Sequence, residues 1–253
     1  MPITDIGSYV PAMDEFSAHW DDVNTFLGGT PATDLKLQGS YTRALFLADR
    51  NAIDAAITGL VGLKNTREVA ATNRDALRQG LIARLNSFRG MLRALLPNSI
   101  YAGAAPLVPP ISSAESKFLN PFDDMSNLWG KINADATIPG FTPPLLLAGL
   151  TLAQFQTELA TMRTGFTAVT IAENDENIGR QSRDALLDPA RERMVQYRVL
   201  VEAVLGPTHA LTLSLPALSP PPGSTPPAVV LSGLWNPGVS AAVFNWTPST
   251  AAN

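Results

Sequence analysis

Arg74-Asp75-Ala76-Leu77 recurs 109 positions later as Arg183-Asp184-Ala185-Leu186. Outward from this tetrapeptide, the same offset aligns residues 14–96 with residues 123–205 without a gap. Nineteen of these 83 positions are identical, whereas chance identity from average composition is roughly 6–7%. Identical pairs outside the tetrapeptide include Trp20/Trp129, Asn24/Asn133, Leu37/Leu146 and Phe46/Phe155. The sequence therefore predicts two tandem copies of one unit.

Each tetrapeptide lies within a long stretch of helical character. In the first copy this stretch runs from about Tyr41 to Leu96 without a proline, and in the second from Thr151 to Leu205. Apolar residues in its final third follow one another in steps of three and four, the spacing of a helix packing seam. The seam is Leu77, Leu81, Leu85, Phe88, Leu92 and Leu95 in the first copy, and Leu186, Ala190, Met194, Tyr197, Val201 and Val204 in the second.

The middle of each long stretch is polar, around Asn65 and Asn174. Asn65 with Glu68 three residues later fits a capping box, which would begin a new helix and make a helical hairpin. No glycine or proline marks a turn at that point, so we favour one continuous helix. Farther along, Pro189 and its counterpart Gly80 predict a bend or break in both helices.

A short amphipathic helix opens each copy. In the first, Pro11 occupies a favourable position in the first turn and Gly28-Gly29 ends the helix. In the second, Pro121 is expected at the start. The apolar stripe is Met13, Phe16, Trp20, Val23 and Leu27 in the first copy, and Met125, Trp129 and Ile132 in the second.

The composition changes at Ser219. A proline-rich linker is followed by two β-prone runs, Ala228–Trp235 and Ala241–Trp246, which predict a hairpin. The expected fold is all-α, with two tandem helical repeats and a short C-terminal β-hairpin. Each repeat consists of a short helix plus a long helix or helical hairpin. The segments are residues 1–110 for repeat 1, 111–218 for repeat 2 and 219–253 for the tail.

The run Val243-Phe244-Asn245-Trp246-Thr247-Pro248 resembles the second strand of a fibronectin type III domain, with Trp246 at its core tryptophan. The preceding strand and turn fit the first strand, so the resemblance covers residues 228–248. A sandwich of that kind has about seven strands, of which the tail supplies two. The resemblance implies that the hairpin packs on the helices, packs on a neighbouring subunit, or belongs to a longer multidomain protein.

Charge and composition argue against several classes of function. The net charge is −4, which gives no attraction to nucleic acid or to anionic membranes. Without cysteine, the chain forms neither disulfides nor thiolate metal sites. The longest apolar run, Leu145–Leu152, is too short for membrane insertion, which needs about 20 residues. Residues 1–16 show no signal peptide.

The repeated arginines and aspartates are the sharpest polar feature. They suit a surface that binds anions or partners, or ion pairs between helices, and we favour the ion pairs. Trp20 and Trp129 are expected in the core rather than at a binding surface, and His19 is expected to be structural. No motif indicates catalytic, cofactor-binding or metal-binding residues. The predicted interface comprises Arg74, Asp75, Arg84, Arg89, Arg183, Asp184, Arg193, Arg198, Val230, Leu231, Trp235, Val243, Phe244 and Trp246.

Duplicated long helices and a β tail with open edges predict a non-enzymatic structural protein that associates with copies of itself into a filament or sheath. The alternative is an N-terminal helical binding or spacer module of a larger fibronectin-type surface protein. No cofactor is expected. The sequence does not fix the compartment, although an extracellular or cell-surface location is favoured over a cytoplasmic one. An enzyme would need a site made of Arg, Asp and Glu on facing helices.

Overall fold

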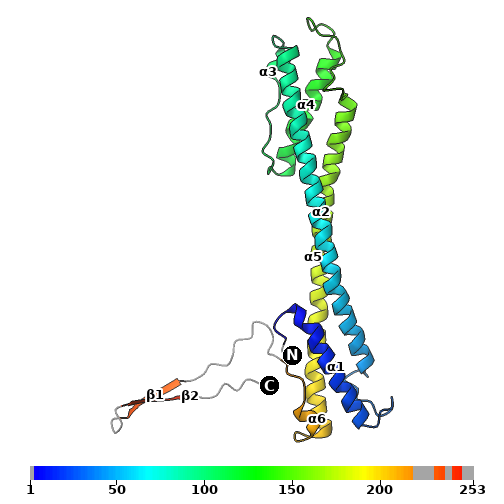
Figure 1. Cartoon of the computed structure of the whole chain (residues 1–253), viewed down its shortest axis with the longest axis vertical. Coiled ribbons are helices and arrows are strands. Elements are labelled where there is room, and N and C mark those ends of the chain that lie inside the picture. The colour runs from blue at the N-terminus through cyan, green and yellow to red at the C-terminus, as the bar shows by residue number, and fades with distance from the viewer. Residues whose placement is uncertain (1–2, 219–230, 237–240, 247–253) are drawn as a thin grey trace. The chain divides into compact units, whose positions relative to one another are not determined.

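The computed structural model describes residues 3–218, 231–236 and 241–246, and the chain is mostly helical, as predicted (Figure 1). A 3-10 turn, η1 (Ile6–Ser8), leads into the first helix. The helices are α1 (Tyr9–Phe26), α2 (Arg43–Leu95), α3 (Ile100–Gly103), α4 (Glu115–Ala134), α5 (Leu152–Leu205) and α6 (Ala210–Leu213). The strands are β1 (Leu231–Asn236) and β2 (Ala241–Trp246).

The described residues divide into two compact units: unit 1 falls within residues 1–58 and 181–253, and unit 2 within residues 59–180. Each of the two long helices contributes one stretch to each unit. The predicted segments 1–110 and 111–218 are the two copies of the sequence repeat. Units 1 and 2, in contrast, are the groups of residues that pack together. Each hydrophobic core therefore combines residues from both halves of the sequence.

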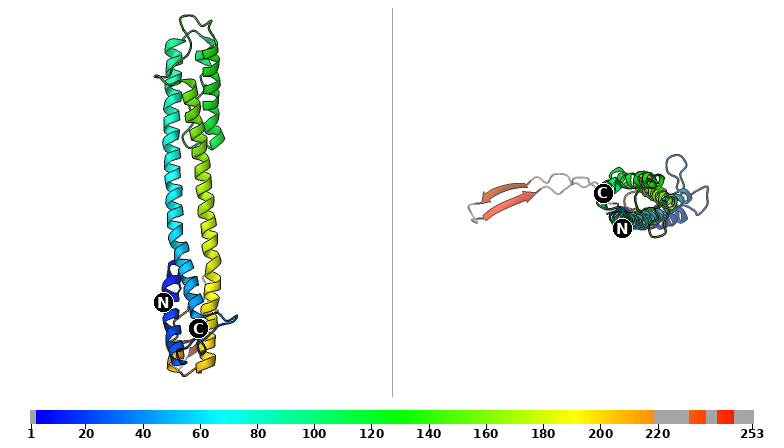
Figure 2. Two further views of the ribbon diagram at one scale, coloured as in Figure 1. Left: turned by 90° about the vertical axis from the view of Figure 1, so that its right-hand side faces the viewer. Right: turned by 90° about the horizontal axis from the view of Figure 1, so that it is seen from above.

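Unit 1 packs α1 against the first part of α2 and the last part of α5 (Figure 2). Trp20 is fully buried between two rings, with its ring centroid 5.8 Å from that of Phe46 and 4.8 Å from that of Tyr197. Its Nε1 donates to the Leu35 carbonyl at 3.2 Å, and the Leu35 N–H donates to Asn24 Oδ1 at 2.9 Å. A tryptophan and an asparagine one helical turn apart thus hold both backbone groups of one leucine.

Unit 2 contains the same arrangement, built from α4, the last part of α2 and the first part of α5. Trp129 lies between Phe155 and Phe88, at centroid distances of 5.8 and 5.6 Å. Its Nε1 donates to the Leu145 carbonyl at 3.0 Å, and Asn133 Oδ1 accepts from the Leu145 N–H at 2.7 Å. Both tryptophans are fully buried, so their predicted place in the core is confirmed.

The loop after each short helix departs from the gapless alignment by one residue. Leu37 and Leu147 are buried and each donates its N–H across a narrow turn, to the carbonyls of Tyr41 and Leu150. Leu146, which the alignment paired with Leu37, is about half exposed. The pairing Leu37/Leu146 is therefore wrong, because backbone hydrogen bonding and burial place Leu147 in the equivalent position.

Both long helices are continuous, as favoured. Neither ends near Asn65 or Asn174, so the helical-hairpin alternative is wrong, and α5 runs through Pro189 without a break. The seam ends one residue later than predicted: Leu95 and Val204 are about half exposed, whereas Leu96 is buried. A step of four from Leu92 keeps the last leucine on the core face.

Helix α1 ends where predicted, since Gly28 and Gly29 have positive φ angles of 123° and 61°. The expected start of the second short helix at Pro121 is wrong, because α4 begins at Glu115 and encloses that proline. Phe118 and Leu119 precede Pro121 and are buried. Their burial extends the apolar face of α4 and favours a longer helix, although the proline removes one backbone donor.

Strands β1 and β2 pair antiparallel, with Leu231 opposite Trp246 and Asn236 opposite Ala241. The linker and the turn between the strands lie outside the described residues.

Candidate functional site

The tetrapeptide arginines pair with the aspartates next to them in sequence. Arg74 Nε donates to Asp75 Oδ1 at 2.9 Å, and Arg183 Nε donates to Asp184 Oδ1 at 2.8 Å. The hydrogen bond from Arg74 lowers the pKa of the Asp75 carboxyl. Both aspartate side chains are at least half exposed. The expected ion pairs exist, but at these positions they lie within one helix rather than between helices.

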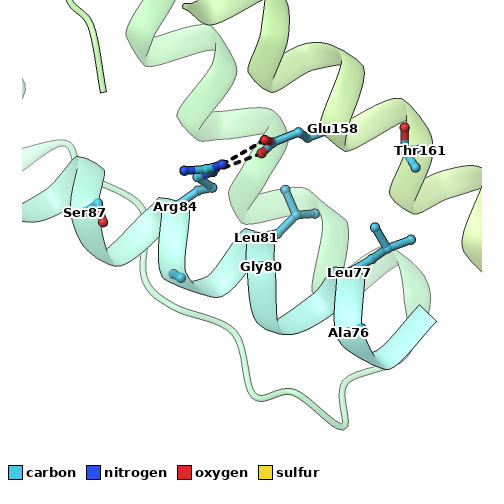
Figure 3. A pocket seen from close by; sticks show the side chains of 9 residues that line it. Ala76, Leu77, Gly80, Leu81, Arg84, Ser87, Glu158 and Thr161 are labelled. Carbon is cyan, nitrogen blue, oxygen red and sulfur yellow. Dashed lines mark hydrogen bonds and ion pairs between the residues drawn. The ribbon is translucent and has the colours of Figure 1, made fainter. Parts of the chain in front are cut away.

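Arg84 makes the predicted kind of pair between helices. Its Nε and a terminal nitrogen donate to both oxygens of Glu158, at 3.1 and 3.0 Å, which joins α2 to α5 within unit 2 (Figure 3). Arg193, its counterpart in the alignment, instead has its guanidinium carbon 4.5 Å from the Tyr41 ring centroid. The Tyr41 hydroxyl donates to Asp49, and burial together with this carboxylate raises the pKa of Tyr41.

Arg89 and Arg198 hold the segments that follow their helices. Arg89 donates to the Pro106 carbonyl at 3.1 Å, and Arg198 donates to the Pro216 carbonyl. A hydrogen bond to a charged donor is stronger than one between neutral groups. These two arginines therefore fasten an irregular segment to the helix that precedes it, in the same way in each unit.

A shallow groove of about 380 Å³ opens beside the Arg84–Glu158 pair in unit 2 (Figure 3). Its α2 wall is made mostly of small side chains, and Thr161 lies on its α5 wall. The lining residues on α2 are Ala76, Leu77, Gly80, Leu81, Ala83, Arg84 and Ser87. Arg84 is thus the one predicted interface residue that borders this groove.

Arg78 is a buried arginine that the sequence did not single out, because its counterpart is Leu187. Its guanidinium carbon lies 5.1 Å from the Phe118 ring centroid and 4.8 Å from that of Phe166. Two of its nitrogens donate to the carbonyls of Ile111 and Ser113, at 2.7 and 3.0 Å. Burial lowers the pKa of this guanidinium. Arg78 therefore anchors the segment leading into α4.

Arg67 and Glu176 form an ion pair that the sequence did not single out either. Their positions differ by 109, the offset of the repeat. Arg67 Nε lies 2.9 Å from Glu176 Oε2, and Arg180 also pairs with this carboxylate. Glu176 is buried. The sequence could have indicated this ion pair, because Arg67 and Glu176 carry opposite charges at equivalent positions in the polar middle of the two long helices.

His19 is buried with both ring nitrogens bonded within unit 1. Nε2 lies 2.8 Å from the Leu211 carbonyl, and Nδ1 lies 2.6 Å from the Tyr197 hydroxyl. Because a carbonyl only accepts, the neutral His19 ring carries its proton on Nε2, and in that tautomer the Tyr197 O–H donates to Nδ1. Burial, together with the charge of Asp22, raises the pKa of Tyr197. The contacts are those of a structural histidine.

The remaining predicted interface residues lie in the tail. The strands contain Leu231 and Trp235 in β1, and Val243, Phe244 and Trp246 in β2. Their backbone register is set by the pairing of β1 with β2. Val230 lies outside the described residues.

Within residues 3–218 and the two strands, no three His, Asp or Glu side chains gather where they would hold a metal ion. In the same part of the chain, no helix combines the length and the apolar character needed to cross a membrane. Comparisons with models of protein families, with curated proteins and with solved structures find no match for this chain.

Proposed function

We propose that this chain is a non-enzymatic structural protein that associates with copies of itself. In this proposal two tandem helical repeats form the body, and a β-hairpin tail makes the contact between subunits. The observation that carries it is the two-stranded sheet, in which β1 and β2 pair only with each other among the described residues. Each strand therefore keeps one edge of backbone donors and acceptors available for another strand.

Strand addition is a common way to use such an edge, because the main chain supplies hydrogen bonds along the whole strand. A hairpin of two strands is marginal alone in water. Pairing with a strand of a neighbouring chain would stabilise it. A head-to-tail contact of this kind gives an open filament when its rotation does not close into a ring.

The helical part supports the tandem-repeat element of the proposal. The hydrogen bonds from Trp20 and Asn24 to the backbone of Leu35 recur as those from Trp129 and Asn133 to the backbone of Leu145. The ties of Arg89 and Arg198 to proline carbonyls recur in the same way. The arginines predicted as an interface are engaged in contacts within the chain, which favours a structural role for them.

The test is the mass in solution, by light scattering, of the full chain and of a variant lacking residues 219–253. We expect a large assembly for the full chain and its loss in the deletion variant. Val243→Pro, which disrupts β2, should act like the deletion, whereas Ser224→Pro in the proline-rich linker is the matched control. A full chain that stays monomeric at high concentration contradicts the proposal, and so does assembly that ignores both tail variants.

A further inference from the structure

The two repeats bury each other's apolar faces. In unit 1, Trp20 of repeat 1 stacks on Tyr197 of repeat 2, and in unit 2, Trp129 of repeat 2 packs on Phe88 of repeat 1. Each short helix therefore lies against the last part of the long helix of the other repeat. The structure thus shows both sides of the surface that joins the repeats, including the positions at which the two sides differ.

Arg67 and Glu176 make the two repeats complementary in charge. They occupy equivalent positions, and Arg67 Nε lies 2.9 Å from Glu176 Oε2, so this contact joins a position to its own counterpart. In a complex of two repeat 1 chains built in the same way, Arg67 would face a second Arg67. In a complex of two repeat 2 chains, the buried Glu176 would face a second Glu176. Like charges at such a contact disfavour both complexes.

Arg78 also fits repeat 2 better than a second repeat 1. Its guanidinium lies between the rings of Phe118 and Phe166, which both belong to repeat 2. The residue equivalent to Phe166 in repeat 1 is Ile57. A second repeat 1 would therefore place an aliphatic side chain against this guanidinium and remove one favourable contact between a cation and a ring face.

A buried hydrogen bond acts in the same direction. His19 Nδ1 of repeat 1 is bonded to the hydroxyl of Tyr197 of repeat 2. The equivalent residues, Leu128 and Phe88, are apolar and lie together in the core of unit 2. In a complex of two repeat 1 chains, Phe88 would take the place of Tyr197 and leave Nδ1 of His19 without its partner, which is costly for a buried polar atom.

Size supplies a further difference. A Cβ atom added at Gly179 would lie 2.6 Å from Leu63 Cδ1 and 3.1 Å from Leu60 Cδ2. The equivalent residue in repeat 1 is Ala70. A second repeat 1 would therefore bring a methyl group to this position, and both leucine side chains would have to shift.

We propose that repeat 1 and repeat 2 are complementary halves, which bind each other in preference to copies of themselves and do not need the peptide link between them. The partner that fits repeat 1 is thus a separate chain with the sequence of repeat 2. Arg67, Arg78 and His19 set the preference on the side of repeat 1. This inference goes beyond the proposed self-association and does not rest on it, because all of these contacts lie within the helical part of the chain.

Cutting the full chain between the repeats tests the proposal. A protease site is inserted after Leu107, which is exposed. Arg74→Cys with Gly165→Cys provides a cross-link between the repeats, because a Cβ atom at Gly165 would lie 3.8 Å from Arg74 Cα. The chain has no other cysteine. The protein is cut, unfolded in urea, refolded and oxidised, and we expect residues 1–107 to be linked to residues 108–253 as completely as in cut protein that was never unfolded. A clearly lower yield overturns the proposal.

The matched control is Arg74→Cys with Ala56→Cys, in the same cut chain. Ala56 is equivalent to Gly165, so these two cysteines meet only if repeat 1 pairs with a second repeat 1. We expect no disulfide-linked dimer of residues 1–107 from this variant. Its appearance would show that repeat 1 also accepts a copy of itself, which contradicts the proposal.

Removing the groups that oppose like pairing tests the named residues. When Arg67→Gln and Arg78→Leu are added to the control, we expect the dimer of residues 1–107 to increase at least about tenfold, because like charges no longer meet. Circular dichroism checks that the chain refolds, and Arg67→Gln alone should act in the same direction. A refolded chain that still gives no such dimer shows that these residues do not set the preference, and the assignment is then wrong.

Discussion

The pair between Arg67 and Glu176 gives the sharpest prediction about stability. Glu176 has a side chain only 6% exposed, and Arg67 Nε lies 2.9 Å from its carboxylate. Removing the partner of a buried charge costs about 3–5 kcal/mol. Arg180 also pairs with Glu176 and is half exposed, so it still neutralises part of the charge of Glu176 when Arg67 is replaced. We therefore expect Arg67→Glu to lower the free energy of unfolding by about 3 kcal/mol.

A double-mutant cycle isolates the contact. Glu176→Arg alone should also destabilise, since it places an arginine beside both Arg67 and Arg180, whereas the double variant Arg67→Glu, Glu176→Arg restores opposite charges at positions 67 and 176. The expected coupling free energy is about 2–3 kcal/mol, at the upper end of measured pairwise terms. Urea unfolding followed by circular dichroism at 222 nm gives the four values required.

The matched control is Lys64→Glu, which makes the same charge change one helical turn away. Lys64 is more than half exposed and pairs with Glu68 at 3.8 Å, so its replacement should cost at most about 0.5 kcal/mol. If the double variant is as unstable as the sum of the two single variants, the two side chains do not interact and the reasoning is refuted.

Three further predictions concern single contacts. Asn24→Ala leaves the buried Leu35 N–H without its acceptor, which should cost about 1–3 kcal/mol and increase hydrogen exchange at that amide. Arg198→Ala removes a charged hydrogen bond to the segment after α5, so limited proteolysis should cut that segment faster. The raised phenol pKa values of Tyr197 and Tyr41 stabilise the folded state fully below about pH 10, the value in an unfolded chain. This stabilisation is lost as the pH rises from about 10 towards the raised pKa values of the folded state. Absorbance at 295 nm should therefore show that both phenols ionise only when the protein unfolds in alkali.

Helix periodicity predicted the elements well because a buried helix face imposes its spacing on the sequence. The seam of Leu81, Leu85 and Phe88 is buried as expected. The choice between Leu95 and Leu96 failed, since adjacent leucines fit the pattern equally and only packing separates them. Likewise, an alignment without gaps could not place Leu147, whose position depends on hydrogen bonds in a loop.

Which segments share a core could not be predicted, because periodicity shows that a face is buried but not what covers it. Trp20 stacks on Tyr197 from the other half of the sequence, and nothing local to either residue indicates this. Repetition also drew attention to the arginines that recur. Repetition did not identify Arg78 and Arg67, because their counterparts are Leu187 and Glu176. A position whose residue type differs between the two copies leaves no repeated signal.

The sharing of each core between distant segments has a consequence for the order of folding. All of unit 2 lies between residues 59 and 180, so its helices can pack while the rest of α5 is still being synthesised. Unit 1 must wait, because His19 finds its partner in Tyr197, 178 residues later. Closing so long a loop is entropically costly and slow. The apolar stripe of α1 can contact Phe46 and Ile53 of α2 earlier, but it lacks its α5 partners until the last turns of α5 have been synthesised. We therefore expect unit 2 to fold before unit 1.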